Sequence, residues 1–302
     1  MDIDELLKMA EDETGQQVSD VSFVQGGNSI KKEHLKVSLS DGKKILIKKY
    51  HMSPSRLKEL TEISSLNIDC FQKLLSVHPT GEDEGYLLME WNEGIILNDG
   101  SYESDSYRMR EDVRKAAEAL RHLHEATKTQ QIIMVTTDDV NAINEKRYLT
   151  SEQKRILIDY ITSNIDLTNG RCRSVIHGDF HLANILIQDS RVVFLDIDDV
   201  GYGDPYMDLV YAANLQYTRK EQLRYYWFLQ YYFDHEIPGE FWRIVNCYSL
   251  IKGMVIIESE IRKSQDRNAV LSIDSLFKEH ENMTRQEPNW FLKIQQRQEA
   301  NK

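Results

Sequence analysis

The sequence has few of the features that mark secreted or membrane proteins. Three cysteines lie far apart in 302 residues, without a CxxC pair, which fits a reducing compartment. No apolar run approaches the roughly 20 residues that a membrane span requires. The N-terminus is acidic where a secretory signal is basic and then apolar. We therefore expect a cytoplasmic protein with no membrane partner.

Positive charge is also scarce. The 37 lysines and arginines are outnumbered by 49 aspartates and glutamates, which gives a net charge of −12. A protein that binds the nucleic-acid backbone needs a basic surface, so we expect no nucleic-acid partner and favour neutral or cationic small molecules. The chain has no internal repeat or low-complexity segment, and its apolar share of 41% is typical of a globular protein. We expect a monomer or weak dimer.

The hydrophobic pattern changes from strand-like to helix-like along the chain. Apolar residues alternate with polar ones over residues 35–39, and Asp41-Gly42 is a typical hairpin turn. From about residue 107 onward, apolar residues recur at helical spacing. The sequence therefore predicts the α+β class in two lobes. These are a mostly β lobe over residues 1–91, a linker over 92–106, and a mostly helical lobe over 107–302.

Local signals predict where several elements begin and end. Residues 1–14 read as a short amphipathic helix that Gly15 ends. The segment 71–77 reads as a strand, although a helix fits it equally. Capping residues indicate helix starts at Ser53-Pro54, Thr150 to Gln153, Thr218 to Glu221, and Pro238.

The chemistry of the chain concentrates between Val175 and Asp208. Two apolar, β-branched runs, residues 185–187 and 192–195, are joined by a polar turn, which predicts a β-hairpin. Because a hairpin brings its outer ends together, the polar residues that flank the two strands are expected to form one site. These residues are His177, Asp179, His181 and Asn184 before the first strand, and Asp196, Asp198 and Asp199 after the second.

Several carboxylates so close together require a cation. Magnesium prefers oxygen ligands, and Asn184 and Asp196 offer a neutral and a charged oxygen. Asp179, left off the metal, can accept the proton of an attacking hydroxyl and orient it in line with a γ-phosphate. This order of residues suits metal-assisted phosphoryl transfer. The alternative is a metal-dependent hydrolase with His177, Asp179 and His181 as ligands.

Two longer motifs in this region resemble those of a known family. The sequence HGDFHLAN from His177 to Asn184 resembles the HGDxHxxN catalytic loop of the aminoglycoside phosphotransferase family, which has the protein-kinase-like fold. The segments Asp196–Asp199 and Gly203–Leu209 resemble the acidic and GDPxxDLA motifs that follow this loop in the family. The resemblance implies a two-lobed small-molecule kinase. Residues 1–91 would then form the nucleotide-binding lobe, residues 92–106 the hinge and linker, and residues 107–302 the lobe that carries the catalytic hairpin and the substrate region.

The resemblance also implies roles for individual residues of the hairpin. Asp179 is expected to be the catalytic base, and Asn184 and Asp196 are expected to bind magnesium. Asp198 stands where the family often has an acidic residue able to touch a second metal. The expected structural supports of the loop are His177, Asp204 and Asp208.

The resemblance extends into the N-terminal lobe. Lys48 resembles the lysine that contacts the α- and β-phosphates of the nucleotide, with Lys49 as the alternative. Glu59 is expected to pair with this lysine, as the kinase helix glutamate does, with Glu62 as the alternative. Other expected nucleotide contacts are the phosphate loop of Gly26, Gly27, Asn28 and Ser29, and the hinge residues Glu90 and Asn92, whose backbone would meet adenine.

Together these motifs predict a kinase that uses Mg²⁺ and ATP (or GTP). We expect it to move the γ-phosphoryl group to a hydroxyl of a small amino-bearing molecule such as an aminoglycoside, which the resemblance and the acidic composition favour. Choline-like alcohols, sugars and homoserine-like metabolites are alternative acceptors, because the substrate region matches no motif. A nucleotide-binding pseudokinase is a further alternative, although all the catalytic residues are present.

Overall fold

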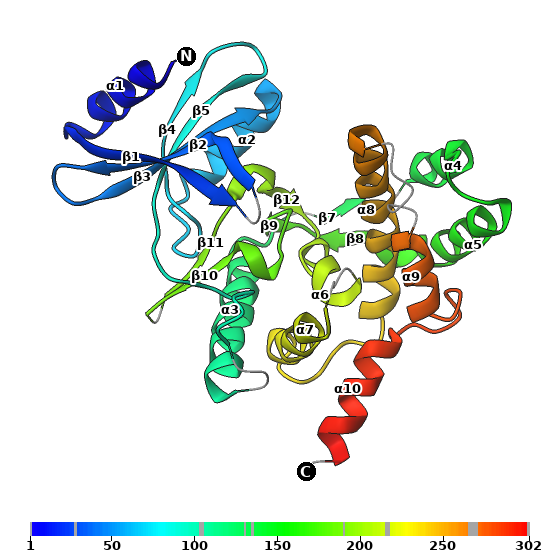
Figure 1. Ribbon diagram of the computed structural model, residues 1–302. Coiled ribbons are helices and arrows are strands. Elements are labelled where there is room, and N and C mark those ends of the chain that lie inside the picture. Colours follow the sequence, from blue (N-terminus) through cyan, green and yellow to red (C-terminus); the bar gives the residue numbers. More distant parts are fainter. Residues whose placement is uncertain are drawn as a thin grey trace. The chain divides into compact units, whose positions relative to one another are not determined.

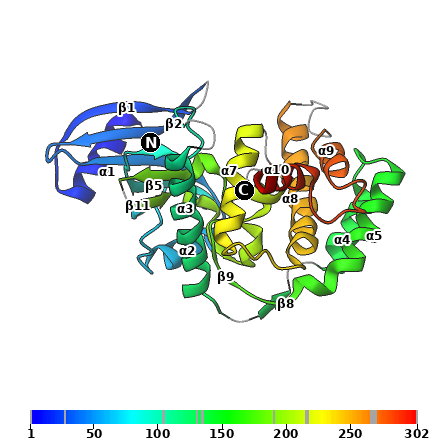
Figure 2. The ribbon, with the colours of Figure 1, turned by 90° about the horizontal axis from the view of Figure 1, so that it is seen from below.

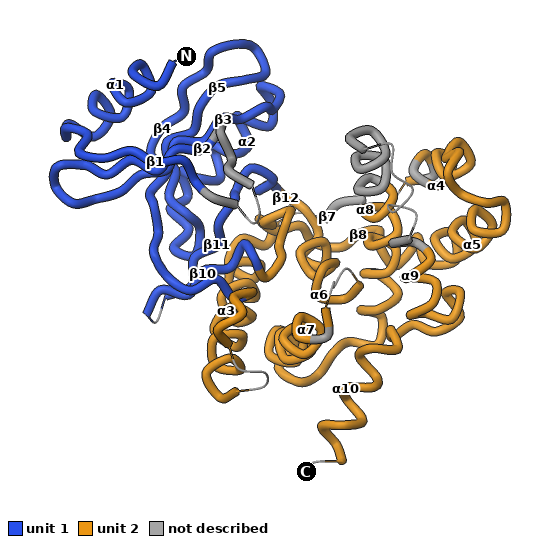
Figure 3. The backbone as a smooth tube through the Cα atoms, in the orientation of Figure 1, with its two compact units in different colours: residues 1–97, 183–201 blue, residues 98–182, 202–302 orange. Residues whose placement is uncertain are grey.

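The computed structural model describes residues 2–26, 29–102, 106–129, 131–133, 136–189, 191–214, 218–264 and 271–300. The chain forms two compact units, which Figure 3 distinguishes by colour. Unit 1 contains residues 1–97 and 183–201, and unit 2 contains residues 98–182 and 202–302. The structure thus groups the hairpin with the N-terminal strands, while the predicted lobe boundaries at residues 91 and 106 stay a prediction.

Unit 1 is built on a five-stranded antiparallel sheet (Figure 1). Its strands are β1 (Val18–Gly26), β2 (Ser29–Leu39), β3 (Lys44–His51), β4 (Leu74–Pro79) and β5 (Glu84–Glu90). They lie in the order β1-β2-β3-β5-β4. The Asp41-Gly42 turn joins β2 to β3, as predicted. The segment predicted as a strand at residues 71–77 is a strand, shifted to β4, so its helical alternative was wrong.

Helix α1 (Ile3–Thr14) packs on this sheet. It begins with a capping box between Asp2 and Glu5 and ends at Gly15, whose left-handed backbone (φ 67°) stops the helix as predicted. Alternate residues of a strand point to one face, and those of β2 and β3 meet α1 in a common core. The buried members of this core are Leu6, Ala10, Leu35, Val37, Leu39, Ile45, Ile47 and Leu88.

The predicted hairpin is confirmed. Strand β10 (Ile185–Gln188) pairs antiparallel with β11 (Arg191–Phe194), and β6 (Ile95–Ile96) adds to the other edge of β10. Helix α2 (Pro54–Ser64) also begins where the sequence indicated, with Ser53 as its N-cap. All of these elements belong to unit 1.

Unit 2 is mostly helical. Its helices are α3 (Tyr107–Ala126), α4 (Thr137–Glu145), α5 (Ser151–Thr168), α6 (Val210–Asn214), α7 (Arg219–Tyr232), α8 (Phe241–Ser264), α9 (Leu271–Glu279) and α10 (Asn289–Ala300). Helix α8 packs against α5, α6 and α9, and α7 packs against α3 and α10 (Figures 1 and 2). The capping boxes at Thr150 and Thr218 open α5 and α7 as predicted. No helix in the described part of the chain is long and apolar enough to cross a membrane.

Two helices of unit 2 differ from the sequence pattern. Helix α8 begins at Phe241 rather than at Pro238, because a turn closed by the Phe241 N–H and the Pro238 oxygen (3.0 Å) precedes it. The residues after Glu281 are mostly polar, yet they include α10. Trp290 and Phe291 anchor this helix, since each is only 4% exposed.

Short elements carry the motifs between these helices. Strand β9 (Ser174–Ile176) leads into the catalytic loop, and the 3₁₀ turn η1 (Leu182–Asn184) ends it. A further 3₁₀ turn, η2 (Ile197–Asp199), follows β11. The remaining short elements are β7 (Gln131–Ile133), β8 (Asn169–Cys172), β12 (Gly201–Gly203) and the 3₁₀ turn η3 (Pro205–Met207).

Candidate active site

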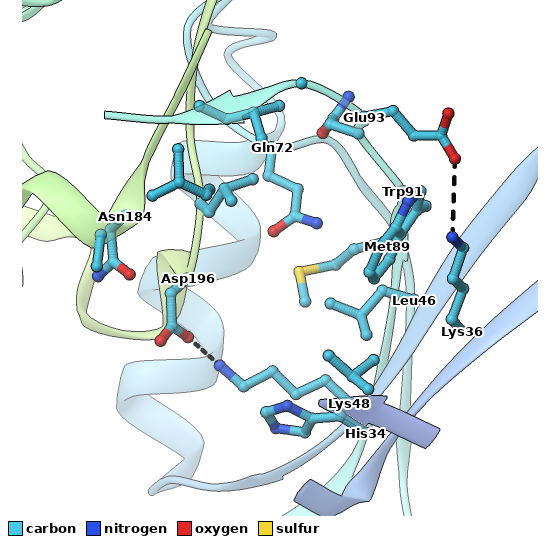
Figure 4. Close-up of a pocket in the computed structure, with 17 residues that line it drawn as sticks. His34, Lys36, Leu46, Lys48, Gln72, Met89, Trp91, Glu93, Asn184 and Asp196 are labelled. Atoms are coloured by element: carbon cyan, nitrogen blue, oxygen red, sulfur yellow. Dashed lines mark hydrogen bonds and ion pairs between the residues drawn. The ribbon is translucent and has the colours of Figure 1, made fainter. Parts of the chain in front are cut away.

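Unit 1 contains a cavity of about 510 Å³, and all of its described lining residues belong to that unit. Figure 4 shows Asn184 and Asp196 on one side, Met89 and Trp91 on the other, and Lys48 reaching toward Asp196. Apolar walls with a few convergent polar groups are typical of small-molecule sites. Of the residues predicted from the sequence, the lining includes Lys48, Asn92, Asn184 and Asp196.

Lys48 is a buried cation in the wall of this cavity. The residue is 7% exposed, and its Nζ forms ion pairs with Asp196 Oδ1 and, at 2.7 Å, with Asp198 Oδ2. Burial disfavours the charged ammonium, but the two carboxylates outweigh this effect and raise the pKa of Lys48 above its ordinary value. Lys49 instead forms an ion pair with Glu84 at 3.3 Å. Of the two lysines, Lys48 is therefore the one that lines the cavity.

Lys48 does not provide a partner for every oxygen of the two carboxylates beside it. Asp198 Oδ1 is buried without a hydrogen-bond partner among the described residues, and burial raises the pKa of Asp198 although Lys48 opposes the shift. Asp196 has a left-handed backbone (φ 63°), a strained conformation for a residue with a side chain. Asn184, which is 8% exposed, adds a carboxamide to the same wall. These oxygen donors, with one orphaned atom and excess negative charge, fit Mg²⁺.

The segment after β5 supplies polar atoms to the cavity wall. Asn92 Oδ1 and Trp91 Nε1 are buried and have no hydrogen-bond partner in the part of the chain that the structure describes. Glu90 is not among the described lining residues, since its N–H donates to the Lys73 oxygen and its carbonyl accepts from Gln72 Nε2, both at 2.9 Å. Asn92 thus lines the cavity and Glu90 does not, while the contact of their backbones with adenine stays a prediction.

Gln72 is a site residue that the sequence did not reveal. It is only 5% exposed and points into the cavity in Figure 4. A carbonyl oxygen only accepts hydrogen bonds, so the contact with Glu90 fixes Nε2 toward that carbonyl. The other amide atom, Oε1, has no partner among the described residues. No motif marks Gln72, because it lies in the irregular segment before β4.

The structure describes only two of the four residues of the predicted phosphate loop. Gly26 and Ser29 are opposite each other at the ends of β1 and β2. Gly27 and Asn28 lie outside the described residues. Their role in phosphate binding stays a prediction.

Helix α2 carries Glu59, the predicted partner of Lys48. Glu59 forms an ion pair with Arg56, and Arg56 also donates to the backbone oxygens of Asp198 (3.2 Å) and Val200 (2.9 Å). Arg56 therefore ties α2 to the η2 segment, a contact that the sequence did not reveal. The pairing of Lys48 with Glu59 stays a prediction, and the alternative, Glu62, forms its ion pair with Lys58 at 3.7 Å.

In unit 2, the carboxylate of Asp179 lies near a histidine, a lysine and a tyrosine hydroxyl. Asp179 Oδ2 lies 3.5 Å from His181 Nε2, and Oδ1 lies 3.6 Å from Lys252 Nζ. Burial raises the pKa of Asp179, but hydrogen bonds from His181 and Tyr211 and the charge of Lys252 outweigh it and hold this pKa well below its usual range. The carboxylate is therefore ionised at neutral pH and suited to accept a hydrogen bond from a hydroxyl.

Asp208 holds the turn that precedes Asp179. Its buried carboxylate accepts the N–H groups of His177 and Gly178, both at 2.8 Å, and lies 3.1 Å from His124 Nε2. Gly178 has φ 83°, a conformation that residues with side chains rarely adopt. His177, which is fully buried, accepts the Asp179 N–H on Nδ1 at 3.3 Å. Side chains thus fix the loop through its backbone amides.

Asp204 is fully buried in the same region of unit 2. It accepts the Tyr206 N–H at 2.8 Å and the Tyr248 hydroxyl at 3.0 Å, and it forms an ion pair with Arg171. These partners fix the start of η3, the 3₁₀ turn that leads toward Asp208.

Asp208→Ala is expected to lower the free energy of unfolding by about 3–5 kcal/mol, because it leaves His124 and the two loop N–H groups buried without their acceptor. Burial would raise the pKa of Asp208, but His124 and the loop amides lower it. A lowered folded-state pKa stabilises the protein above the unfolded-state pKa, and this contribution is lost as the pH falls. Urea denaturation across acidic and neutral pH measures both effects.

The control for this variant is Asp138→Ala, since Asp138 is exposed on α4 of the same unit. It should change stability by less than about 0.5 kcal/mol. Equal stability of the Asp208→Ala variant and wild type at neutral pH would contradict the bracing role.

The hydrolase alternative receives no support. In the described part of the chain, no group of three or more His, Cys, Asp or Glu side chains is close enough to hold a metal ion. His177 Nδ1 instead accepts a backbone N–H.

A family model described as the phosphotransferase enzyme family matches residues 61–239. The chain belongs to this phosphotransferase family. The matched range includes the catalytic loop and both segments that follow it, so the family suggested by these motifs is confirmed. Among curated proteins, none matches the chain by sequence.

Solved structures of other phosphotransferases are similar to this one. Aminoglycoside phosphotransferase APH(4)-Ia, in a complex with ADP and hygromycin B, has 14% identity and a TM-score of 0.63, over 90% of this chain and 96% of its own. The GDP and kanamycin complex of an APH(2″) enzyme has 12% identity and a TM-score of 0.63, over 93% and 99%. Macrolide 2′-phosphotransferase MphH from Brachybacterium faecium has 14% identity and a TM-score of 0.57, over 91% and 97%. These likenesses confirm the α+β, protein-kinase-like fold of this family member.

Proposed function

We propose that this phosphotransferase moves the γ-phosphoryl group of ATP to a hydroxyl of a small amino-bearing molecule such as an aminoglycoside. The observation that carries the proposal is the cavity in which Lys48 meets Asp196 and Asp198, with Asn184 in the same wall. Lys48 would hold the α- and β-phosphates. Asn184 and Asp196 would hold Mg²⁺, with Asp198 beside them, and the bound metal would neutralise charge on the phosphate oxygens.

In this proposal Asp179 orients the acceptor. Its carboxylate stays ionised beside His181 and Lys252, so it accepts a hydrogen bond from the acceptor hydroxyl and aims that oxygen at the phosphorus. As the new O–P bond forms, the bond between the γ-phosphorus and the β,γ-bridging oxygen breaks, ADP leaves, and the hydroxyl proton moves toward Asp179. Positioning and charge stabilisation supply most of the rate enhancement in such transfers.

Gln72 supports ATP rather than GTP as the donor. Its Nε2 is committed to the Glu90 carbonyl, so the atom left for a ligand is the acceptor Oε1. Adenine carries an amino donor at the position where guanine carries an oxygen, and an acceptor facing an acceptor is unfavourable.

Gln72→Leu is expected to lower kcat/KM for ATP by about tenfold, the equivalent of one lost hydrogen bond. The value for GTP should fall less or rise, because the repelling oxygen is gone. The measurement is kcat/KM for both donors with one acceptor. Gln296→Leu, at an exposed position of α10, is the matched control. An unchanged ATP to GTP ratio in the Gln72→Leu variant would exclude Gln72 from base recognition.

The acceptor class rests on the acidic composition and on the ligands of similar structures. Hygromycin B and kanamycin are bound in two of those structures, and a third is a macrolide phosphotransferase. The test is a coupled assay of ADP release over aminoglycosides, amino-sugars, amino-alcohols and macrolides, with mass spectrometry of the product. A phosphorylated amino-bearing product supports the proposal, and turnover confined to acceptors without an amino group would contradict it. We expect the reaction to take place in the cytoplasm.

A further inference from the structure

We propose that Lys252, on α8, is a positioning residue for Asp179 and that Tyr211, on α6, holds Lys252 in place. This inference rests on the proposed function, because it takes Asp179 as the group that orients the acceptor hydroxyl. Lys252 lies 74 positions after Gly178, and no motif of the catalytic loop includes it. Both residues belong to unit 2, as Asp179 does.

A single ammonium group fixes two parts of the loop. Lys252 Nζ donates to the Gly178 carbonyl at 2.7 Å and lies 3.6 Å from Asp179 Oδ1. The N–H of Gly178 is bound on its other side by Asp208 at 2.8 Å. Gly178 is therefore held by an anion at its N–H and by a cation at its carbonyl. This double restraint matters because glycine has the widest choice of backbone conformations.

Tyr211 contacts Lys252, His181 and Asp179 itself. Lys252 Nζ lies 4.7 Å from the centre of the Tyr211 ring, within the range of a cation–π interaction. The Tyr211 ring also meets the His181 ring edge-on at 5.3 Å, and its hydroxyl hydrogen-bonds to Asp179. One aromatic ring thus sets the positions of the two nitrogen groups that flank Asp179.

This arrangement determines the direction of the carboxylate. Lys252 lies at Oδ1 and His181 at Oδ2, so rotation of the carboxylate would lengthen at least one of these two contacts. The remaining lone pairs of the carboxylate then point in a fixed direction, and the acceptor hydroxyl must approach from that direction. Orientation of this kind is the main contribution of a base in phosphoryl transfer.

Variants at Lys252 test the proposal with an acceptor that the wild type phosphorylates. Lys252→Met should lower kcat by about 10²-fold, since a misplacement of about 1 Å at the reacting groups costs this much. The Kd for MgATP, measured by calorimetry, should not change. Lys252→Gln keeps a hydrogen-bond donor without the charge and should be intermediate, and Lys252→Arg should restore most of the activity.

A second readout separates positioning from a merely structural role. Loss of the Lys252 charge leaves His181 and Tyr211 as the partners of Asp179, so the acidic limb of the kcat profile should move to higher pH in the Met and Gln variants. Tyr211→Phe keeps the ring and should retain more activity than Tyr211→Leu. Lys278→Met, at an exposed position of α9, is the control and should match the wild type.

Wild-type kcat and an unmoved acidic limb in Lys252→Met would overturn the proposal. Failure of the wild type on every acceptor would instead contradict the proposed function. In that case, hydrogen exchange of the 174–182 segment decides the Lys252 inference. Faster exchange in Lys252→Met than in Lys278→Met supports it, and equal exchange overturns it.

Discussion

Asp179→Ala is expected to lower kcat by about 10³-fold, within the range that a positioned acid or base contributes. The variant loses the only group proposed to orient the acceptor hydroxyl. The cavity residues proposed to bind the nucleotide all belong to unit 1, whereas Asp179 belongs to unit 2. The Kd for MgATP should therefore stay close to the wild-type value. Product formation by mass spectrometry and MgATP binding by calorimetry measure the two effects.

Two further variants complete this test. Asp179→Asn retains the size of the side chain and removes the charge that pairs with His181 and Lys252, so it should be nearly as inactive. Asp166→Ala removes an exposed aspartate of α5 and should have wild-type activity. Full turnover by Asp179→Ala would show that another group orients the acceptor.

Asp196→Asn is expected to raise the Kd for MgATP by about tenfold or more, because the metal loses a charged ligand. Asparagine is the appropriate replacement, since Asp196 has φ 63° and asparagine tolerates the left-handed region better than alanine does. The charge of Lys48 remains partly balanced by Asp198 at 2.7 Å. ATP binding measured without magnesium should therefore change little.

The matched control is Asp83→Asn, because Asp83 is an exposed aspartate of the same unit and is not among the described residues that line the cavity. Calorimetric titrations of each variant with ATP, in the presence of magnesium or of a chelator, separate the metal-dependent part of the affinity. An Asp196→Asn variant that keeps wild-type MgATP affinity would remove Asp196 from the proposed metal site.

Local sequence signals account for much of this fold. The alternation around Leu35, the Asp41-Gly42 turn and the capping boxes at Thr150 and Thr218 each depend on neighbouring residues, and each is present where predicted. The hairpin that separates Asn184 from Asp196 is equally local, so its spacing could be read from the chain.

The missed features depend on contacts between distant segments. Gln72 matters because it bonds to the Glu90 carbonyl, and Arg56 matters because it reaches the backbone of Val200. Lys252 lies on α8. The apolar spacing of this helix indicates which of its residues are buried, but not that Lys252 reaches the catalytic loop. Helix α10 was not predicted, because its own sequence is mostly polar. It depends on Trp290, which packs against a distant segment and donates to the Ala213 carbonyl. A sequence pattern carries no record of such partners.

The ion pairs of Lys48 have a consequence for ligand order. Lys48 holds Asp196 Oδ1 and Asp198 Oδ2, so its ammonium neutralises part of the negative charge that a metal would otherwise meet in the free enzyme. The phosphates of an incoming nucleotide would draw the ammonium away and release the oxygens for the metal. Each ligand then favours the other, a heterotropic linkage that is reciprocal by thermodynamic necessity. Metal occupancy should therefore follow nucleotide occupancy, with Lys48 serving as the placeholder cation between turnovers.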